Sequence, residues 1–589
     1  MRKWVADFET TVPKIQIPEV GEEEYFEPEY DFDPSTRVWA WGVRELWNPG
    51  SFIYGNDINE FMEWCSKQKG NPVIYFHNLK FDGEFIFYWL LTNGFTYDKK
   101  KNTKTFNCII SDMGQFYSIE IIYKRMNKRY QKVTFYDSLK KLPFPVKTIG
   151  KAFKLPVQKG EIDYKKERPP GYEPDDEEID YLENDLEVVA QALEIQFDQG
   201  LDRMTNGSDA LHWFKELIGK RFEKLFPVLP LNVDEEIRYA YKGGFTYADP
   251  RFRGKNIDHG SVYDVVSLYP SVMYDQPLPY GVPVPFEGEY EYDKFYPLYI
   301  QKIYCEFKLK PGKIPTIQIK HHPGYKATEY VEETKYGPVS LVLTSVDIEL
   351  FFEHYDVTVH EYINGYKFKQ CIGVFRQYIN YWLKIKKENK GAIRQLAKLM
   401  LNSLYGKFAS NPDVTGKIPE IDEETGGVKY VKGPEENKDP VYTAMGCFIT
   451  AWARYKTINA AQENYDRFIY ADTDSLHLIG TEPPKGLDVG FDLGEWEPEG
   501  YFMRARFLRA KTYIEYMCYK LDEKGDKISV LPEECHWVEL KVTCAGMPDK
   551  VKAKVTWQNF KEGFSEKGKN VPRHVPGGIV LVDSEFTIH

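Results

Sequence analysis

Two aspartates, Asp472 and Asp474, stand one residue apart inside the apolar stretch "FIYADTDSLHL". If this stretch is one continuous strand, side-chain alternation places both carboxylates on the same face; if "DTD" is the bend of a hairpin, both lie at its tip. Either arrangement crowds two negative charges, which costs free energy unless a cation lies beside them. Mg²⁺ is the natural candidate, because proteins bind it with one or two carboxylates together with substrate phosphates.

A further acid, Asp264, lies in a second apolar stretch, "YDVVSLYPS", which predicts a strand. Two ions about 4 Å apart, bridged by Asp264 and Asp474, would suit in-line phosphoryl transfer, in which one activates a 3′ oxygen and the other neutralises the leaving pyrophosphate. The simpler alternative is that Asp264 and Asp472 only cap strand ends. With 89 acids in 589 residues, two acids at this spacing are expected by chance about a dozen times.

The stretch "GAIRQLAKLMLNSLYGKF" predicts a helix with a polar stripe. At 100° per residue, two cations, an amide and an aromatic ring fall close together on one side of it. This set suits a triphosphate held by the cations, with a base stacked on the aromatic ring. An ordinary amphipathic helix with a basic face is the alternative. The stripe consists of Arg394, Lys398, Asn402 and Tyr405, and Lys386 on a preceding helix could join it.

A second group of acids lies near the N-terminus. "ADFET" places Asp7 and Glu9 on one strand face, "FHNLKFD" supplies Asp82, and "YLEND" puts Tyr181 and Asp185 on one helix face. Four carboxylates and a tyrosine could hold two metal ions and orient a water for phosphodiester hydrolysis. Taken singly, each of these residues is better explained as solvated surface.

The net charge of the chain is a poor guide to the kind of partner that it binds. A net charge of −12 argues against a nucleic-acid partner, but the charge is segregated. Residues 19–33 hold eight acids and no base, whereas residues 384–398 hold six bases and one acid. We therefore expect basic channels on an acidic body.

Composition also narrows the class of protein. The content of 42% hydrophobic and 16% aromatic residues indicates a packed globular chain. No apolar run approaches the ~18 residues of a membrane span, and no signal-peptide core precedes Asp7. The eight scattered cysteines form no CxxC pair, which favours a reducing, cytosolic setting over disulfides or a zinc site.

The order of elements predicts several units. Alternating strands and helices over 1–205, including a helix over 177–197, indicate an α/β unit that ends near 200–206. Residues 276–373 are rich in Pro, Tyr and Gly, with β-like runs such as "IPTIQIK". A long helical section follows over 374–408, and then a hairpin or loop over 411–440.

Together these motifs resemble those of one enzyme family. "DFET", "YFHNLKFDG" and "YLEND" resemble the three exonuclease motifs of family B DNA polymerases, and "DVVSLYPS", "KLMLNSLYG" and "YADTDS" resemble the three polymerase motifs, in order. "YKGG", "KTY" and "DSLKKLPFPVK" narrow the resemblance to the protein-primed replicative polymerases of phi-twenty-nine-type bacteriophages, and it extends nearly end to end.

The resemblance implies a multidomain α/β and α+β fold. A ribonuclease H-like 3′–5′ exonuclease domain would precede a right-hand polymerase with two insertions. The first insertion would dock a priming terminal protein, and the second would close around DNA for processivity and strand displacement. The implied ranges are 1–205 for the exonuclease, 206–275 and 443–545 for the palm, 276–374 and 411–442 for the insertions, 375–410 for the fingers and 546–589 for the thumb.

It also implies a role for each polymerase motif residue. Asp264, Asp474 and the Val265 carbonyl would bind metal, with Asp472 in support. Tyr269 would lie beneath the incoming sugar and exclude a 2′-hydroxyl. The triphosphate would contact Lys386, Arg394 and Lys398, and the nascent base pair would contact Asn402 and Tyr405. The template would contact Tyr241, Gly243 and Gly244, and the primer end would contact Lys511, Thr512 and Tyr513.

In the exonuclease, the resemblance implies metal binding by Asp7, Glu9, Asp82 and Asp185, assisted by Tyr181 and Lys159. The frayed single strand would be held by Thr10, His77, Asn78, Phe81, Ser138 and Leu139. Arg394 departs from the family, in which a lysine is usual, and the acidic stretch 19–33 looks inserted.

We therefore expect a DNA-templated DNA polymerase with 3′–5′ proofreading that uses two Mg²⁺ ions per site, with Mn²⁺ as a substitute. Its expected partners are primer–template and single-stranded DNA, dNTPs and a terminal protein. We expect it to act as a monomer in the cytoplasm of a bacterial host. Alternatives are a nuclease with a DNA-holding scaffold and a non-catalytic factor that coats single strands. RNA-directed synthesis is disfavoured by Tyr269 and the proofreading motifs.

Overall fold

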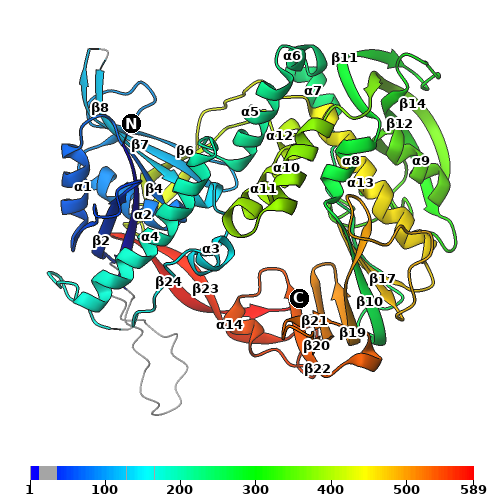
Figure 1. The fold of residues 1–589 in the computed structure, drawn as a ribbon. Helices are drawn as coiled ribbons and strands as arrows, with labels where there is room; N and C mark the ends of the chain where they lie inside the picture. The colour runs from blue at the N-terminus through cyan, green and yellow to red at the C-terminus, as the bar shows by residue number, and fades with distance from the viewer. Residues whose placement is uncertain (1, 12–35, 128, 165, 321) are drawn as a thin grey trace, which may run out of the picture.

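The computed structural model describes residues 2–11, 36–127, 129–164, 166–320 and 322–589; the acidic stretch 19–33 lies outside them. The described residues form a mixed α/β protein in which two eight-stranded sheets flank a group of helices (Figure 1). Within these ranges, no helix combines the length and the apolar character of a bilayer span. All eight cysteines are free.

The N-terminal sheet has the strand order β3-β2-β1-β4-β8-β7-β6-β5. β1 pairs antiparallel with β2 and parallel with β4, so the strand with Asp7 and Glu9 lies inside the sheet. The mixture of strands and helices expected for 1–205 is present, but strands and helices alternate only from β3 to β5. Its elements are β1 (Lys3–Thr10), β2 (Val38–Glu45), β3 (Ile53–Gly55), α1 (Ile58–Lys67), β4 (Val73–Phe76), α2 (Leu79–Thr92), β5 (Thr96–Tyr97), β6 (Thr105–Ile110), β7 (Phe116–Met126), β8 (Arg129–Asp137), α3 (Val146–Phe153) and α4 (Asp176–Asp198).

Helix α4 lies close against this sheet. It begins with a capping box in which Asp175 and Glu178 each accept from the other's backbone N–H. A Cβ atom at Gly42 of β2 would lie 2.9 Å from side-chain atoms of Leu182 and Leu186. The glycine therefore allows the close approach of the helix that carries Asp185.

The second sheet has the order β21-β20-β19-β10-β18-β17-β9, with β22 paired to β20. The strand expected at "YDVVSLYPS" ends at Val265, and "LYPS" begins α8 instead. The elements around this sheet are β9 (Thr246–Ala248), β10 (Asn256–Val265), α8 (Leu268–Asp275), α13 (Thr443–Glu463), β17 (Phe468–Asp472), β18 (Ser475–Ile479), β19 (Trp496–Arg509), β20 (Thr512–Leu521), β21 (Lys527–Ser529) and β22 (Trp537–Cys544).

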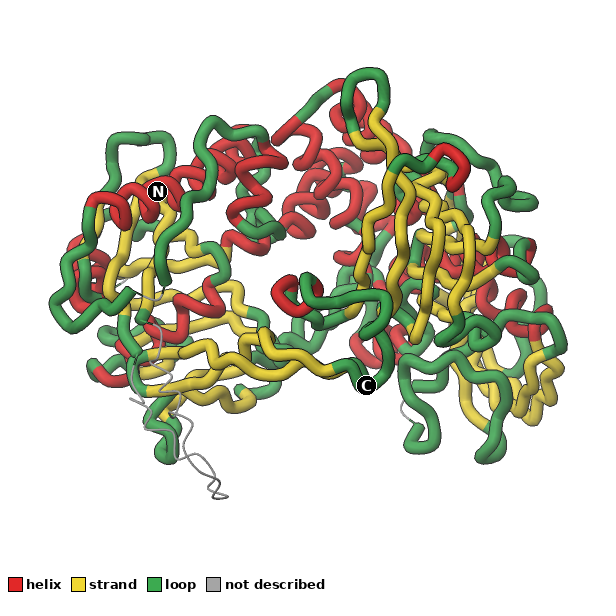
Figure 2. Tube along the Cα trace, turned by 90° about the horizontal axis from the view of Figure 1, so that it is seen from below, coloured by secondary structure: helices red, strands yellow, loops and turns green. Residues whose placement is uncertain are grey.

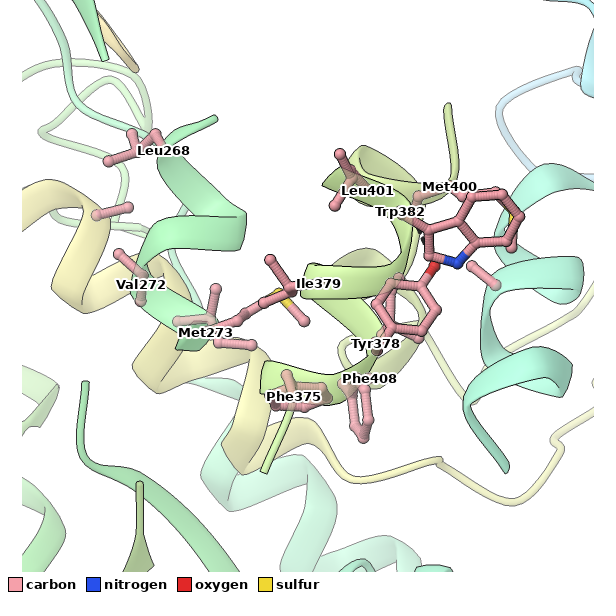
Figure 3. Packing of buried hydrophobic residues seen from close by; sticks show 14 of the residues in the cluster. Leu268, Val272, Met273, Phe375, Tyr378, Ile379, Trp382, Met400, Leu401 and Phe408 are labelled. Atoms are coloured by element: carbon pink, nitrogen blue, oxygen red, sulfur yellow. Dashed lines mark hydrogen bonds between the residues drawn. The ribbon is translucent and has the colours of Figure 1, made fainter. Parts of the chain in front are cut away.

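The long helical section expected at 374–408 is three helices. Gly391, the first residue of the second helix, adopts a φ of +59°, a conformation that glycine adopts without strain. Figure 3 shows Ile379 near Met273 of α8, and the Tyr378 hydroxyl donates to the Met400 carbonyl at 2.8 Å. The helices of this region are α5 (Asn206–Ile218), α6 (Arg221–Leu225), α7 (Leu231–Arg238), α10 (Arg376–Glu388), α11 (Gly391–Ser403) and α12 (Tyr405–Phe408).

Residues 278–371 form a separate four-stranded sheet in the order β11-β14-β12-β13. The prediction of a strand at "IPTIQIK" is wrong: the segment is buried over 314–317 but forms no strand, and the Thr316 N–H donates to the Tyr355 hydroxyl at 2.8 Å. The hairpin expected within 411–440 is confirmed as β15–β16. These elements are β11 (Leu278–Glu287), β12 (Leu298–Leu309), β13 (Val339–Thr344), α9 (Ser345–His354), β14 (Tyr355–Cys371), β15 (Lys417–Ile421) and β16 (Val428–Lys432).

The last hairpin of the chain, β23 (Ser565–Val575) and β24 (Gly578–Thr587), follows the short α14 (Asp549–Lys552) and returns to the N-terminal sheet (Figures 1 and 2). At its turn, the Thr36 N–H donates to the Pro576 carbonyl at 2.9 Å. Ile579 joins the apolar core of the N-terminal sheet. The last hairpin of the chain is therefore packed on the N-terminal sheet.

We expect Gly577→Ala to destabilise this contact. Gly577 has a φ of +94°, and a Cβ atom there would lie 1.8 Å from the Thr36 carbonyl oxygen. The matched control is Gly563→Ala, because Gly563 has a φ of +81° but open space around it. Both substitutions carry backbone strain of about 1–2 kcal/mol, and Gly577→Ala adds an overpacking cost of about 1–3 kcal/mol. Urea unfolding measures the difference, and equal losses in the two variants would contradict the tight contact.

Candidate active sites

Asp264 and Asp474 lie side by side where two neighbouring strands end. Asp264, near the end of β10, is paired opposite Ser475, the first residue of β18. The Val265 N–H donates to the Asp474 backbone carbonyl at 2.8 Å. Thr473 has a φ of +62°, so "DTD" is the bend of the β17–β18 hairpin and not part of one continuous strand. We call β17–β18 the catalytic hairpin.

The two carboxylates repel each other in a half-buried place. Burial raises the pKa of Asp264 to about 7, with further contributions from Asp474, Glu499 and Glu497. Burial and the charges of Asp472 and Glu499 likewise raise the pKa of Asp474. The site therefore disfavours its own negative charge and would gain from a bound cation.

Asp472 has a different environment, because groups of the protein already satisfy it. Its carboxylate accepts hydrogen bonds from the Thr246 hydroxyl at 2.9 Å and the Tyr470 hydroxyl at 3.2 Å. Lys511 lies 3.1 Å from its Oδ2 atom. The arrangement distinguishes Asp472, a neutralised neighbour, from the unpaired Asp264 and Asp474.

A cavity of about 630 Å³ opens beside Asp264 and Asp474; we call it the central cavity. Among its lining residues are three cations, two tyrosines and two amides. Burial lowers the pKa of Lys386, and the charges of Arg394 and Lys398 lower it further. Three cations that repel one another would be relieved by a bound anion. The site residues that line the cavity are Asp264, Val265, Tyr269, Lys386, Arg394, Lys398, Asn402, Tyr405 and Asp474.

The expected stripe is thus brought to one cavity, but not by one helix. α11 ends at Ser403, and Tyr405 begins the short α12. The Tyr405 ring stacks on Tyr269 with centroids 4.0 Å apart. One guanidinium nitrogen of Arg394 donates to the Lys386 backbone carbonyl at 2.8 Å, which ties the Arg394 side chain to α10.

The "YKGG" segment packs against the tip of the catalytic hairpin. The Thr473 N–H donates to the Phe245 carbonyl at 2.7 Å, and a Cβ atom at Gly244 would lie 2.6 Å from Thr473 Oγ1. Tyr241 is partly buried, and Gly243 is exposed. The glycine at 244 allows this segment to touch the hairpin between its two aspartates.

A buried ion pair also holds the "YKGG" segment in place. Arg454 of α13 donates at 2.9 Å to the carbonyls of both Lys242 and Gly243. Its guanidinium also donates to both carboxylate oxygens of Asp347 on α9, at 2.7 and 2.9 Å. Sequence reasoning missed Arg454 and Asp347, since neither belongs to a recognisable spacing.

Of the expected primer contacts, only Lys511 is exposed. It occupies the turn between β19 and β20 with a φ of +57°. Thr512 is buried, and Tyr513 lies in an aromatic group with Tyr470 and Phe507. The two buried residues therefore fix the position of Lys511.

The N-terminal acids come from three elements: Asp7 and Glu9 from β1, Asp82 from α2 and Asp185 from α4. Burial raises the pKa of Asp7 to about 7, and the Asp185 charge adds to it. Burial, followed by the Asp7 charge, raises the pKa of both Glu9 and Asp82. We call these four residues the N-terminal acid group. As in the Asp264–Asp474 pair, burial raises the pKa of each carboxyl.

Lys159 and two tyrosines adjoin this group. Lys159 forms an ion pair with Asp185 and donates to the Tyr181 hydroxyl at 2.9 Å. Tyr164, which sequence reasoning missed, shares a 2.7 Å hydrogen bond with the Tyr181 hydroxyl. Burial raises the pKa of Asp185, and Lys159 opposes that shift.

Four of the six expected single-strand contacts form one network. His77 bonds the Ser138 hydroxyl at 3.0 Å through Nδ1. The backbone N–H groups of Asn78 and Leu139 both donate to Asp137 Oδ1, at 3.1 and 3.0 Å. Asp137 was missed. Thr10 instead ends β1, and Phe81 packs on Phe85 at 5.7 Å.

Glu497 was also missed, although it lines the central cavity. It is paired opposite Asp264 on the neighbouring strand β19. The signal was available, because "WEPE" repeats the two-residue spacing of acids seen in "DTD".

Comparison with known proteins identifies the family. Residues 65–489 match the family described as DNA polymerase type B, organellar and viral. The DNA polymerase of Bacillus phage B103 is 52% identical over 95% of this chain and 98% of its own length. The DNA polymerase of Bacillus phage phi29 is 53% identical over the same shares.

A solved structure agrees with the sequence comparison. Phi29 DNA polymerase complexed with primer-template DNA and incoming nucleotide substrates superposes with a TM-score of 0.92, at 50% identity and with both chains fully covered. The chain therefore belongs to the type B DNA polymerases of organelles and viruses, and among them to the phi29-type phage DNA polymerases.

Proposed function

We propose that this DNA polymerase copies a phage genome from a DNA template and proofreads with a separate 3′–5′ exonuclease site. The supporting observation is the presence of two distant carboxylate groups with raised pKa values, one of them beside a cavity lined by three cations. We propose the division into domains given by the sequence: exonuclease 1–205, palm 206–275 and 443–545, fingers 375–410, thumb 546–589, and insertions 276–374 and 411–442.

DNA polymerases of this family normally use divalent metal ions, and we assign Mg²⁺, with Mn²⁺ as a substitute. Buried oxygens Asp82 Oδ1 and Asp185 Oδ1 have no hydrogen-bond partner, and a cation would satisfy them. In the ranges that the structure covers, no three acids, histidines or cysteines form a complete ligand group. This fits Mg²⁺, which takes few protein ligands and completes its shell with water and substrate phosphate.

At the polymerase site, Asp264, Asp474 and the Val265 carbonyl would hold the ions. When bound, such ions lower the pKa of the primer 3′-hydroxyl and stabilise the charge on the leaving pyrophosphate. Lys386, Arg394 and Lys398 neutralise and orient the triphosphate. Tyr269, held by its stack on Tyr405, lies under the sugar and excludes a 2′-hydroxyl.

At the exonuclease site, Asp7, Glu9, Asp82 and Asp185 would hold the ions. Tyr181, whose hydroxyl is fixed by Lys159 and Tyr164, orients the attacking water. The backbone network around Asp137 shapes the site for the single strand, which His77, Asn78, Ser138 and Leu139 contact together with Thr10 and Phe81.

Related structures support the choice of partners. Phi29 DNA polymerase has been solved with primer-template DNA and nucleotides, and with single-stranded DNA. We assign the same ligands to this chain, acting as a monomer in the host cytoplasm. The insertion at 276–374 would dock a terminal protein as primer, and that at 411–442 would support processive strand displacement.

Substitutions at the two sites should separate the two activities. Asp264→Asn and Asp474→Asn are expected to slow nucleotide incorporation at least about a thousandfold, because each removes a metal ligand. Asp7→Asn with Glu9→Gln should abolish degradation of a single strand and leave incorporation intact. Primer extension and single-strand degradation with Mg²⁺ measure both. Retained synthesis in Asp264→Asn would refute the assignment of the polymerase site.

Repulsion at the polymerase site should also appear as a pH effect on stability without metal. The folded pKa of Asp264, about 7, exceeds its unfolded value, so ionising it lowers the free energy of unfolding as pH rises from about 4 through 7. After allowance for solvent screening, Asp264→Asn is expected to stabilise the protein by about 1–2 kcal/mol at pH 8 and by less at pH 5.

Urea unfolding in EDTA at both pH values measures this effect. Asp472→Asn is the matched control, because the carboxylate of Asp472 is already paired with Lys511. Equal stabilisation by both variants, or a gain that does not depend on pH, would contradict the repulsion argument.

Protein priming predicts a covalent product. With its cognate terminal protein, Mg²⁺ and labelled dNTPs, the polymerase should join one nucleotide to a protein hydroxyl through its α-phosphate and release pyrophosphate. Gel analysis of the labelled protein detects the adduct, and Asp264→Asn serves as the negative control. A verified partner that yields no adduct would remove protein priming while leaving DNA-primed synthesis standing.

A further inference from the structure

A buried histidine and a buried glutamate meet across the second sheet. His477 Nδ1 lies 2.8 Å from Glu515 Oε1, and the two residues are 1% and 0% exposed. His477 is on β18 and Glu515 is on β20, and in the sheet these strands are separated by β10 and β19. The contact therefore spans the face of a curled sheet and joins strands that share no backbone pairing.

His477 and Glu515 each follow a segment of the polymerase site closely in the sequence. β18 begins directly after Asp474, and His477 is its third residue. β20 begins directly after Lys511, and Glu515 is its fourth residue. The contact thus ties the catalytic hairpin to the strand that carries the proposed primer-end segment, Lys511–Tyr513.

A second connection lies above the first. The Lys511 N–H donates to the Tyr470 hydroxyl at 3.0 Å, and that hydroxyl donates to Asp472 at 3.2 Å. The His477 ring packs among Tyr470, Phe507 and Tyr513, at centroid distances of 5.3 to 5.4 Å. A shift of His477 would therefore move the rings on which Lys511 and Asp472 rest.

Stability alone does not explain a carboxylate in this place. Glu515 is fully buried, its Oε2 atom has no hydrogen-bond partner, and the nearest lysine, Lys541, is 3.9 Å away. An apolar pair of similar volume would commonly be as stable or more so. What an apolar pair lacks is direction: a charge-assisted hydrogen bond fixes the relative position of two strands.

We propose that the His477–Glu515 hydrogen bond is a positioning contact that sets Lys511 and the primer 3′ end against Asp264 and Asp474. This inference rests on the proposed role of Lys511 at the primer end. Neither His477 nor Glu515 touches the reacting atoms. Their contribution is the distance between the catalytic hairpin and the primer-end segment.

Full-length variants can test this inference. Glu515→Leu and His477→Leu remove the hydrogen bond, whereas Glu515→Gln keeps an acceptor and His477→Asn keeps a donor near the Nδ1 position. Glu539→Gln is the matched control, because it breaks the exposed Lys527–Glu539 pair of the same sheet, at 2.7 Å. The measurements are the Kd for primer–template DNA, kcat and KM for the dNTP, and the rate of single-strand degradation.

We expect the leucine variants to weaken primer–template binding and to lower kcat about tenfold, the effect of one charge-assisted hydrogen bond. KM for the dNTP and single-strand degradation should change less than twofold. The Gln and Asn variants, and the Glu539→Gln control, should stay within about twofold of the unaltered protein in every measurement.

Three results would overturn the inference. Unchanged primer binding in Glu515→Leu refutes it, and so does an equal loss of synthesis and degradation, because the pair would then serve only the fold. Failure of both conservative variants to restore binding refutes it as well. Lys511→Ala separates the assumptions: if it binds primer–template DNA normally, the proposed role of Lys511 fails, whatever Glu515→Leu does.

Discussion

The main physical constraint on this structure is that it buries several carboxylates away from water. Asp264 and Asp474 in one half, and Asp7, Glu9, Asp82 and Asp185 in the other, are placed where burial and mutual repulsion favour their protonated forms. A fold selected only for stability would neutralise such groups, as it does Asp472 with Lys511. Among these six described residues Asp185 alone has such a partner, Lys159. Leaving the other five without one costs folding free energy and creates affinity for cations.

The elements around the central cavity offset this loss of folding free energy. The catalytic hairpin lies inside a sheet whose neighbouring strands fix its backbone, and α8, α10 and α11 form a packed apolar layer beside it. Arg454 and Asp347 hold the "YKGG" segment against the hairpin tip. The charged groups are thus carried by elements that strand pairing, apolar packing and buried hydrogen bonds hold in place.

Much of this arrangement could be predicted from the sequence, for identifiable reasons. Acids embedded in apolar strands, such as Asp264, can be recognised in the sequence, because burying a charge is costly and is kept where it serves a function. The helical stripe was found because its spacing follows the helix period, although the break after Ser403 was not visible. Residues that act through tertiary contacts, such as Tyr164, Asp137 and Arg454, carry no local pattern. Their partners lie far away along the chain, so only the fold reveals them.

The return of the last hairpin to the first sheet has a consequence for biosynthesis. Ile579 completes the apolar core of the N-terminal sheet, and Thr36 bonds Pro576, so residues from both ends of the chain share one core. At about 5–20 residues per second, a ribosome reaches the hairpin roughly half a minute to two minutes after the first strand has emerged. Until then the part of the apolar core that Ile579 covers stays open. The N-terminal sheet, first to be made, is therefore among the last parts of the chain to reach its final packing.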